Sequence, residues 1–177
     1  RTDVEVPLVA ELDTMIKCFQ DIDIPRDVSP LSEDILVSVL NSMPIVKVCV
    51  EKESVSFVVR LLVVLQRVTV PMTMSVHRCC INDDILKTVV TPFIREHISL
   101  SSLSLDGNKD ITAAGMTALS DAIITSTSVK CVSLNGCDNI KVNGMKSLLT
   151  ELGSVHERIE GIEIGDTGLT SGDVSVI

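Results

Sequence analysis

The chain has 177 residues, of which 45% are hydrophobic and 22% charged, and its net charge at pH 7 is −9. This length suits a single domain, and the negative charge argues against binding to nucleic-acid phosphates. With three Phe and no Tyr or Trp, the core must be aliphatic, and the aromatic platforms on which single-stranded nucleic acids stack are not expected.

Other classes of function also find little support in the composition. No apolar run is long enough to cross a bilayer, so we expect no membrane partner. The six cysteines form no C-x-x-C pair, so no zinc ribbon is predicted and we expect no metal and no cofactor. Most of them lie within apolar strand patterns, where Cys usually acts as a small buried residue. The chain is therefore predicted to be intracellular (cytoplasmic) and reduced.

Taken in chain order, the hydrophobic pattern predicts alternating strands and helices. Residues 4–12 look like the tail of a helix, and strands with period-two alternation are then expected around six anchors: Ile16, Val46, Met74, Leu103, Val132 and Ile162. The intervening helices are expected to bury apolar stripes at Ile35, Leu36, Val39 and Leu40; Val58, Val59, Leu62 and Leu65; Ile85, Leu86, Val89 and Ile94; Met116, Leu119 and Ile123; Met145, Leu148 and Leu152. Pro30 is expected to begin a helix, whereas Pro92 predicts a kink or an early stop.

An internal repeat relates Leu100–Ile123 to Val129–Leu152, and the two segments align without a gap. The shared pattern is L-x-x-L-x-L-x-x-N/C-x-x-I, followed by a helix with G-[apolar]-x-x-[apolar], and one repeat spans about 29 residues. The six strand anchors extend this spacing along the chain at nearly equal intervals. The pattern resembles the leucine-rich repeat family, of the ribonuclease-inhibitor-like length class.

The resemblance implies an α/β fold, a leucine-rich repeat solenoid (horseshoe) with a parallel sheet on the concave face and helices on the convex face. It implies one domain over residues 1–177 with about five to six repeats. Because the last repeat stops in mid-helix without a polar cap, we expect the chain to be a fragment of a longer protein.

The Asn position of the repeat is expected to shape the loop after each strand. In the family this side chain bonds loop backbone as the chain leaves the strand. The corresponding residues here are Asp21, Glu51, Cys79, Asn108, Cys137 and Thr167. The two acids depart from the pattern and put the geometry of the first two repeats in doubt. One of Cys79 and Cys80 is expected inside the loop ladder and the other outside it.

The exposed strand positions are the candidate partner-binding surface. The residues one position after each anchor form one column: Lys17, Lys47, Ser75, Ser104, Ser133 and Glu163. The residues three positions after each anchor form a second column: Phe19, Cys49, His77, Asp106, Asn135 and Gly165. The residues predicted to contact a partner are Met15, Lys17, Phe19, Lys47, His77, Asp106 and Asn135. His77 and Asp106 near the serine column allow a Ser-His-Asp arrangement, but a cross-strand hydrogen bond within a polar patch is the simpler interpretation.

These observations predict a non-catalytic protein–protein interaction module that binds a partner protein through its concave face, alone or as a subunit of a larger complex. An alternative is the substrate-recognition arm of an F-box-type ubiquitin ligase, suggested by the G-C-x-x-I stretch at Gly136–Ile140. Another is a small-GTPase-activating protein similar to the Ran GTPase activators, which share this repeat class. A catalytic enzyme is the least favoured alternative.

Overall fold

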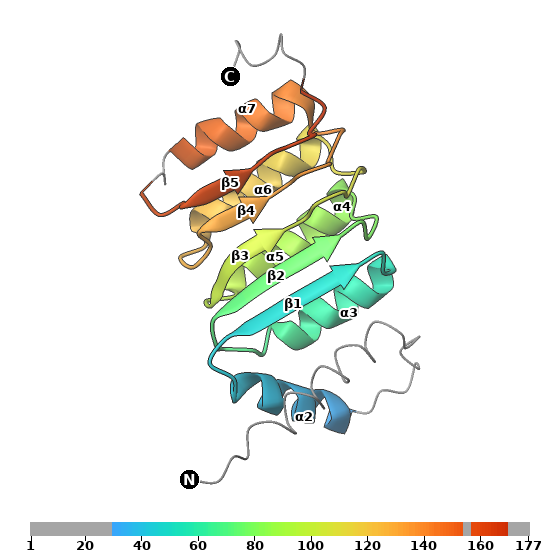
Figure 1. Cartoon of the computed structure of the whole chain (residues 1–177), viewed down its shortest axis with the longest axis vertical. Helices are drawn as coiled ribbons and strands as arrows, with labels where there is room; N and C mark the ends of the chain where they lie inside the picture. The colour runs from blue at the N-terminus through green and yellow to red at the C-terminus, as the bar shows by residue number, and fades with distance from the viewer. Residues whose placement is uncertain (1–29, 154–156, 170–177) are drawn as a thin grey trace.

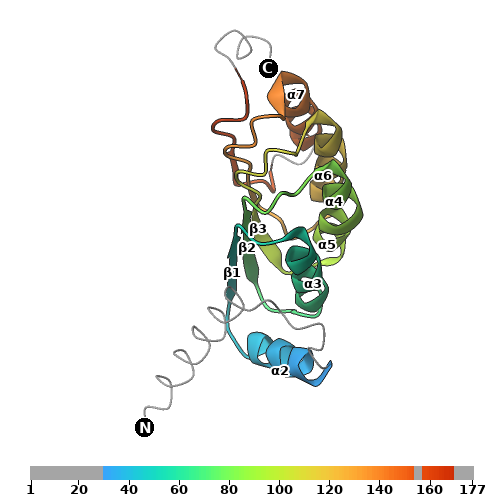
Figure 2. The ribbon, with the colours of Figure 1, turned by 90° about the vertical axis from the view of Figure 1, so that its right-hand side faces the viewer.

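The protein is built from two layers, a parallel sheet and a row of helices that covers one of its faces (Figures 1 and 2). The structure is a computed structural model that describes residues 30–153 and 157–169. Its five strands are adjacent in chain order, and every neighbouring pair is parallel. Right-handed crossovers that always advance in one direction leave all the connecting helices on the same face. The expected α/β class with a parallel sheet is thus confirmed.

The strands and helices alternate along the described chain. The strands are β1 (Val46–Glu51), β2 (Met72–His77), β3 (Leu100–Ser104), β4 (Cys131–Ser133) and β5 (Gly161–Glu163). The helices are α2 (Pro30–Asn41), α3 (Val55–Leu65), α4 (Asp83–Ile85), the π-helical turn η1 (Leu86–Val90), α5 (Thr91–Glu96), α6 (Ala113–Thr125) and α7 (Lys141–Leu152). Five of the six predicted strands therefore have a counterpart, and the strand expected around Ile16 lies outside the described residues.

The predicted register between the first two described strands is wrong by two residues. Val46 pairs with Met72, and Val48, not Val46, pairs with the anchor Met74. Paired residues of β1 and β2 are therefore closer in sequence than the anchors predicted, whereas Leu103 pairs with Met74 as expected. A shift of two residues leaves every side chain on the same face, so the hydrophobic pattern alone could not reveal it.

One backbone feature recurs at the same place after each strand. Lys52, Arg78, Gly107, Gly136 and Asp166 all have positive φ values, between 53° and 72°. The number of residues from one of these positions to the next equals the number that separates paired residues of the two strands that precede them. Non-glycine residues rarely adopt this conformation, and its recurrence shows that successive strand-to-helix loops are built alike.

Most residues of the predicted helix stripes pack against the covered face of the sheet. The buried set includes most of the predicted residues, among them Leu36, Leu62, Leu86, Leu119 and Leu148. Ile35, which was predicted to be buried, is 54% exposed. Successive helical residues point about 100° apart, and α2 buries the side that carries Leu36, Val37 and Leu40. Pro30 begins α2, as predicted.

Pro92 causes a local change of helix type and not an early stop. The helical segment continues to Glu96, and the turn before Pro92 is π-helical, with the N–H of Thr91 donating to the carbonyl of Leu86. A continued π pattern would need an N–H at Pro92 for the carbonyl of Lys87. The buried hydroxyl of Thr91 donates to that carbonyl instead, at 2.9 Å.

Two side chains that lie just before a strand cap the helix of the previous strand–helix unit. The Nε2 atom of His97 lies 3.1 Å from the carbonyl oxygen of Leu65, which ends α3. Arg158 donates in the same way to the carbonyls of Ile123 and Ser126 at the end of α6. Because Ser99 N–H donates to His97 Nδ1 at 3.3 Å, the buried ring must carry its proton on Nε2 and is neutral.

We expect His97 to make the protein less stable in mild acid. Burial lowers the pKa of His97 below 6.5, its value in the unfolded chain. Between these two pKa values only the unfolded state binds the proton. The stabilisation is therefore complete above pH 6.5 and is lost as the pH falls through the lowered pKa, by at most about 1.4 kcal/mol per pH unit. Urea unfolding from pH 7.5 to 5 should show a flatter profile for His97→Gln, which keeps a donor but does not titrate. Parallel profiles would contradict the prediction.

Candidate functional site

The uncovered face of the sheet carries small and polar side chains in columns across the strands. Cys49, Ser75, Ser104, Ser133 and Glu163 form one continuous column, because each pairs with the next in register. Their neighbours on the other face are apolar and either belong to the core or pack against it, so the period-two alternation separates the core from this open face. Towards the carboxyl ends of the strands, a second column provides the residues of the candidate site.

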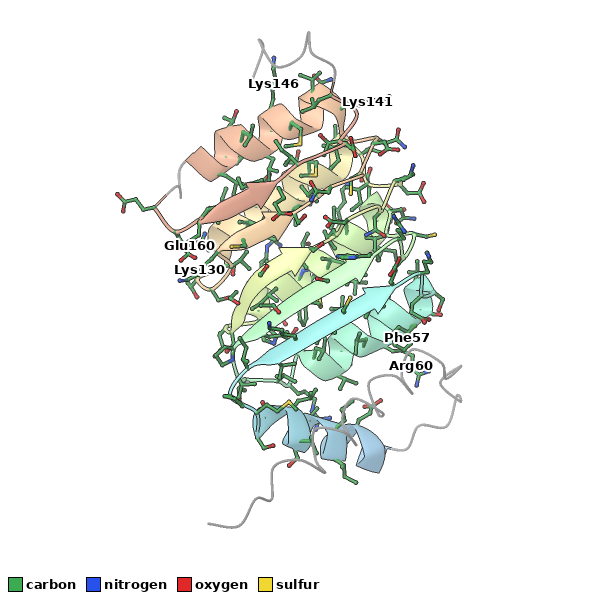
Figure 3. The ribbon with its side chains drawn as sticks, viewed as in Figure 1. Phe57, Arg60, Lys130, Lys141, Lys146 and Glu160 are labelled. Atoms are coloured by element: carbon green, nitrogen blue, oxygen red, sulfur yellow. The ribbon has the colours of Figure 1, made fainter. Side chains whose placement is uncertain are left out.

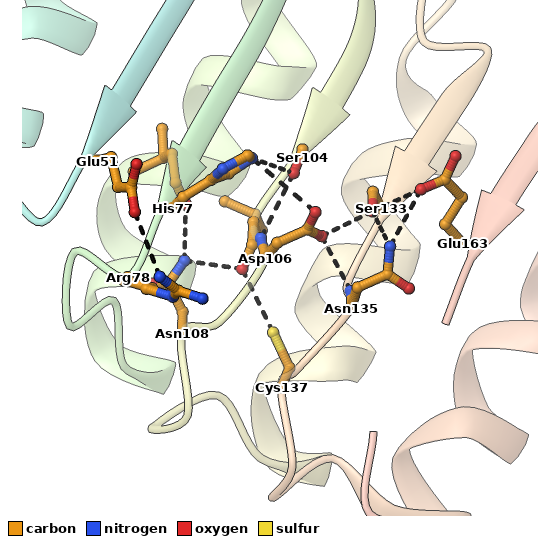
Figure 4. Close-up of polar contacts among 12 residues, drawn as sticks. Glu51, His77, Arg78, Ser104, Asp106, Asn108, Ser133, Asn135, Cys137 and Glu163 are labelled. Atoms are coloured by element: carbon orange, nitrogen blue, oxygen red, sulfur yellow. Dashed lines mark hydrogen bonds and ion pairs between the residues drawn. The ribbon is translucent and has the colours of Figure 1, made fainter. Parts of the chain in front are cut away.

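The second column consists of Glu51, His77, Asp106 and Asn135. We call these four residues, together with Ser104, Ser133 and Glu163 of the first column, the polar row (Figure 4). Glu51 pairs directly with His77 in the β1–β2 register, and the loop backbone continues this ladder, since Gly107 N–H donates to the carbonyl of Asn135 at 2.8 Å. Adjacent strands and strand ends thus supply one line of polar side chains.

Within the polar row, the side chains fix one another across strands. Ser133 Oγ–H donates to Asp106 Oδ1 at 2.6 Å, and the backbone N–H of Asn135 donates to the same oxygen at 2.9 Å. The Asn135 amide donates to Ser133 Oγ and Glu163 Oε2, both at 3.0 Å, and its oxygen accepts from Gly165 N–H at 2.6 Å. These half-buried groups are held in one orientation while their free edges face solvent.

Beneath the row, a buried ladder supports the loops. Asn108 is 1% exposed; its amide donates to the carbonyls of Val76 and Leu105 at 2.8 and 2.7 Å, and its oxygen accepts from the N–H groups of Cys79 and Ile81. The thiol of Cys137, in the next unit, donates to the carbonyl of Leu105 at 3.3 Å. Asn108 and Cys137, which occupy the same position in successive repeats, thus each bind the carbonyl at the end of the preceding strand, that of Val76 and that of Leu105.

The loops that follow the strands line an open depression of about 900 Å³ beside the polar row, which we call the hollow. Its lining includes five carboxylates and two basic side chains: Glu51, Asp106, Asp110, Asp138, Asp166, Arg78 and Lys109. Two ion pairs lie on its rim, Arg78–Glu51 at 3.3 Å and Lys109–Asp138 at 2.8 Å. The Asp138 carboxylate raises the pKa of Lys109, so this amine remains charged. The excess of carboxylates gives the hollow a negative potential that favours basic partners.

The geometry of His77 differs from that of a catalytic triad. Its Nε2 atom lies 2.9 Å from Ser104 Oγ, and the same nitrogen lies 3.9 Å from Asp106 Oδ2. In a triad the carboxylate binds Nδ1 and orients the ring, so that Nε2 is free to take the serine proton. Here both groups face one nitrogen, and the arrangement matches the cross-strand contact of a polar patch.

The two buried thiols beneath the site are poor nucleophiles. Burial raises the pKa of Cys79 above its usual value of 9.0 and raises that of Cys137 to about 11. Because the thiolate is the reactive form, both side chains are structural at neutral pH. Cys79 is buried and Cys80 exposed, which confirms the prediction that one of this pair lies inside the loop ladder.

The predicted partner-binding residues are only partly brought together. His77, Asp106 and Asn135 lie in the polar row, as their common column predicted. Lys47 is exposed at the start of β1 opposite Thr73, in neither of the two columns described above, because of the two-residue register shift. For the same reason Cys49 aligns with Ser75, and Glu51 takes the predicted place of Cys49 beside His77. Met15, Lys17 and Phe19 lie outside the described residues.

Sequence reasoning missed the charged residues of the hollow. Lys109 and Asp138 occupy the same position in the gapless alignment of the two clearest repeats. Opposite charges at equivalent loop positions of adjacent units are a signal that could have predicted their ion pair. Glu51 was assigned to the Asn position of the ladder, whereas its exposed side chain contacts Arg78.

Comparisons with known proteins found no match, so the inference of function rests on this geometry. No family model matches the sequence, and no curated protein matches it. Within residues 30–153 and 157–169, no three His, Cys, Asp or Glu side chains gather as metal ligands would. In the same part of the chain, none of the helices has both the length and the apolar character needed to span a bilayer.

Proposed function

We propose that this chain is a leucine-rich repeat solenoid that binds a partner protein on the open face of its sheet, at the polar row and the adjacent hollow, without catalysing a reaction. The observation that carries the proposal is the open face itself. The crossover helices of most parallel sheets cover both faces, so the strands of such sheets are apolar on both sides. Here the second face is polar, exposed and rigidly hydrogen-bonded.

The repeat part of the proposal is supported by contacts that recur from unit to unit. The loops enter the left-handed region at the same intervals that separate the paired strands. The buried ladder of Asn108 and Cys137 reaches back by the same distance along the chain in both cases, to Val76 and to Leu105. A stack of similar strand–helix units, each contacting its neighbours, is the construction of a solenoid. Such folds bind partners on extended surfaces that no single unit could supply.

The binding part is supported by the preorganisation of the polar row. A partner that meets fixed acceptors loses less conformational entropy than one that must order flexible side chains. Carboxylates outnumber cations around the hollow, so the proposed partner presents Lys or Arg side chains to it. The shared nitrogen contact of His77 supports a recognition role for this row over a catalytic one.

Two exposed ion pairs allow a matched test of this surface. Lys109 and Asp138 form an ion pair of 2.8 Å at the hollow. Lys130 and Glu160 form an ion pair of 2.7 Å at the other end of the strands, where β4 and β5 begin (Figure 3). Exchanging the two members of either pair keeps the net charge and allows an ion pair to re-form. The hollow variant is Lys109→Asp with Asp138→Lys, and the control is Lys130→Glu with Glu160→Lys.

We expect the hollow variant to lose a partner that the control retains. The full protein would be tagged in its native cells, its partners cross-linked and identified, and the strongest one purified for titration. We expect affinity to fall by about tenfold or more in the hollow variant and by less than about twofold in the control, because charge reversal at a binding surface places like charges together. Equal affinities for the two variants, with unchanged melting temperatures, would contradict the proposed surface.

A further inference from the structure

His77 places a titratable ring where the polar row meets the hollow. It is the last residue of β2, and it is among the residues that line the hollow. An imidazole ordinarily changes charge between about pH 5 and 8, and no other side-chain type in the polar row ordinarily titrates in that range. A proton gained by His77 therefore changes the charge of the proposed binding surface.

The Nε2 atom of His77 faces two groups that can accept a hydrogen bond (Figure 4). Ser104 Oγ lies 2.9 Å from it, and Asp106 Oδ2 lies 3.9 Å from it. The serine hydroxyl can donate to an unprotonated nitrogen, whereas the carboxylate can only accept. Protonation puts an N–H on Nε2 and a positive charge on the ring, so the contact with Asp106 becomes an attraction between opposite charges. The side chains of His77 and Asp106 are 32% and 26% exposed, so water screens this attraction only in part.

The oxygen of Asp106 that faces His77 is also the one that a partner can reach. Oδ1 already accepts from Ser133 Oγ–H at 2.6 Å and from Asn135 N–H at 2.9 Å. Within the described part of the chain, Oδ2 accepts no hydrogen bond and has the ring as its nearest charged or titratable neighbour. A partner's Lys or Arg and a protonated His77 would therefore compete for the same oxygen.

The other charges near the ring already have partners. Glu51 pairs with His77 in the β1–β2 register, and its Oε1 atom lies 3.3 Å from Arg78 and 3.6 Å from Lys52. Arg78 directly follows His77 in the chain. The helices cover the opposite face of the sheet, so the charges nearest the ring come from the strands and the loops after them (Figure 2). Two cations thus neutralise Glu51, which leaves Asp106 as the carboxylate that responds to a charge on the ring.

We propose that protonation of His77 closes the polar row to its partner: the imidazolium donates through Nε2 to Asp106 Oδ2 and occupies the free edge of that carboxylate. This inference rests on the binding surface proposed above and adds its regulation. The neutral ring leaves Oδ2 open, whereas the charged ring competes with a partner's cation and also makes the hollow less negative. The affinity for a basic partner therefore falls as the pH drops from neutral into mild acid.

A double-mutant cycle tests whether His77 and Asp106 attract each other only when the ring is charged. His77→Gln keeps an N–H donor that does not titrate, and Asp106→Asn keeps an oxygen for Ser133 and Asn135. Urea unfolding of the full chain would be measured for both single variants and the double variant at pH 7.5 and at pH 5.5. We expect the coupling to change the unfolding equilibrium constant about fivefold at pH 5.5 and less than about 1.5-fold at pH 7.5. A coupling of equal size at both pH values, as a purely structural contact would give, would overturn the proposal.

The binding arm of the test uses a synthetic peptide of ten arginines, titrated into the full protein at low ionic strength. From pH 7.5 to 5.5 we expect its dissociation constant to rise about fivefold for the wild-type protein and less than about 1.5-fold for His77→Gln. His97→Gln is the control, because it removes the buried histidine and should leave the rise unchanged.

The outcomes separate the regulation from the binding surface. With the peptide bound at pH 7.5, an equal rise in the wild-type protein and in His77→Gln, or no rise in the wild-type protein, would overturn the regulation alone. A peptide that does not bind at pH 7.5 would overturn it together with the proposed surface. The unfolding cycle needs no partner, so it reports on the contact between His77 and Asp106 in either case.

Discussion

Replacing Asn108 by alanine is expected to lower the free energy of unfolding by about 4 kcal/mol. The substitution removes four hydrogen bonds inside the loop ladder, at a site that is 1% exposed. The carbonyl of Val76 and the N–H groups of Cys79 and Ile81 lose this partner, while the carbonyl of Leu105 keeps the weaker bond from the Cys137 thiol. Each buried group left without a partner costs about 1 to 3 kcal/mol, which makes this one of the most damaging single changes in the chain.

Two further variants make this prediction specific. Asn108→Cys should lose about half as much stability, because the thiol of Cys137 already donates to the equivalent carbonyl in the next unit, but a thiol accepts hydrogen bonds weakly. Asn139→Ala is the control, since the exposed Asn139 amide makes one bond, to the carbonyl of Lys109 at 2.8 Å, and its loss should cost less than about 1 kcal/mol. Urea unfolding would measure all three, and a loss below about 1 kcal/mol for Asn108→Ala would refute the role of the ladder.

Substituting Gly144 by valine is expected to cost about 3 kcal/mol by forcing α6 and α7 apart. A Cβ atom at residue 144 would lie 2.7 Å from Ile140 Cγ2, 3.0 Å from Ala113 Cα and 3.1 Å from Met116 Cγ. The Ala113 contact is with backbone and cannot be relieved by a change of rotamer. The glycine therefore sets how closely two adjacent units stack.

Gly153→Val is the matched control for this substitution. Gly153 follows α7 with ordinary helical φ and ψ values, and a Cβ placed on it meets nothing within 4 Å. Its replacement should change stability by less than about 0.5 kcal/mol. Thermal and urea unfolding would compare the two proteins, and hydrogen exchange should show faster amide exchange in α6 and α7 of the Gly144 variant alone. Similar stabilities for both variants would show that the helices can separate at little cost.

The two predictions concern the frame that holds the open face in place. Asn108 fixes the loops from which Arg78 and Asp106 extend, and Gly144 fixes the spacing of the units that carry them. The proposed binding by the polar row requires its side chains to keep their positions across several strands, so we expect destabilised frame variants to lose affinity as well. The exchange of Lys109 and Asp138 leaves this frame intact, which is why it serves as the test of binding itself.

The sequence by itself determined the alternation of strands and helices and part of the open face, and its resemblance to leucine-rich repeats predicted the parallel sheet. Period-two alternation separated His77, Asp106 and Asn135 from the core, and the internal repeat placed them in adjacent units. These properties are local or periodic, so they can be derived from the chain without its neighbours. The ladder role of Asn108 was an expectation of the resemblance to leucine-rich repeats, and the repeat spacing only located that position in this chain.

Only the tertiary structure decided the register of β1, the partners of His77 and the exposure of Ile35. A two-residue shift preserves every face, so the hydrophobic pattern fits the expected and the observed register equally well, and only pairing with β2 distinguishes them. The contacts of Ser104 and Asp106 with one nitrogen of His77 depend on rotamers set by side chains of the neighbouring units. Such contacts between units carry no signal in any single segment, because each segment acquires them only when its neighbours are stacked beside it.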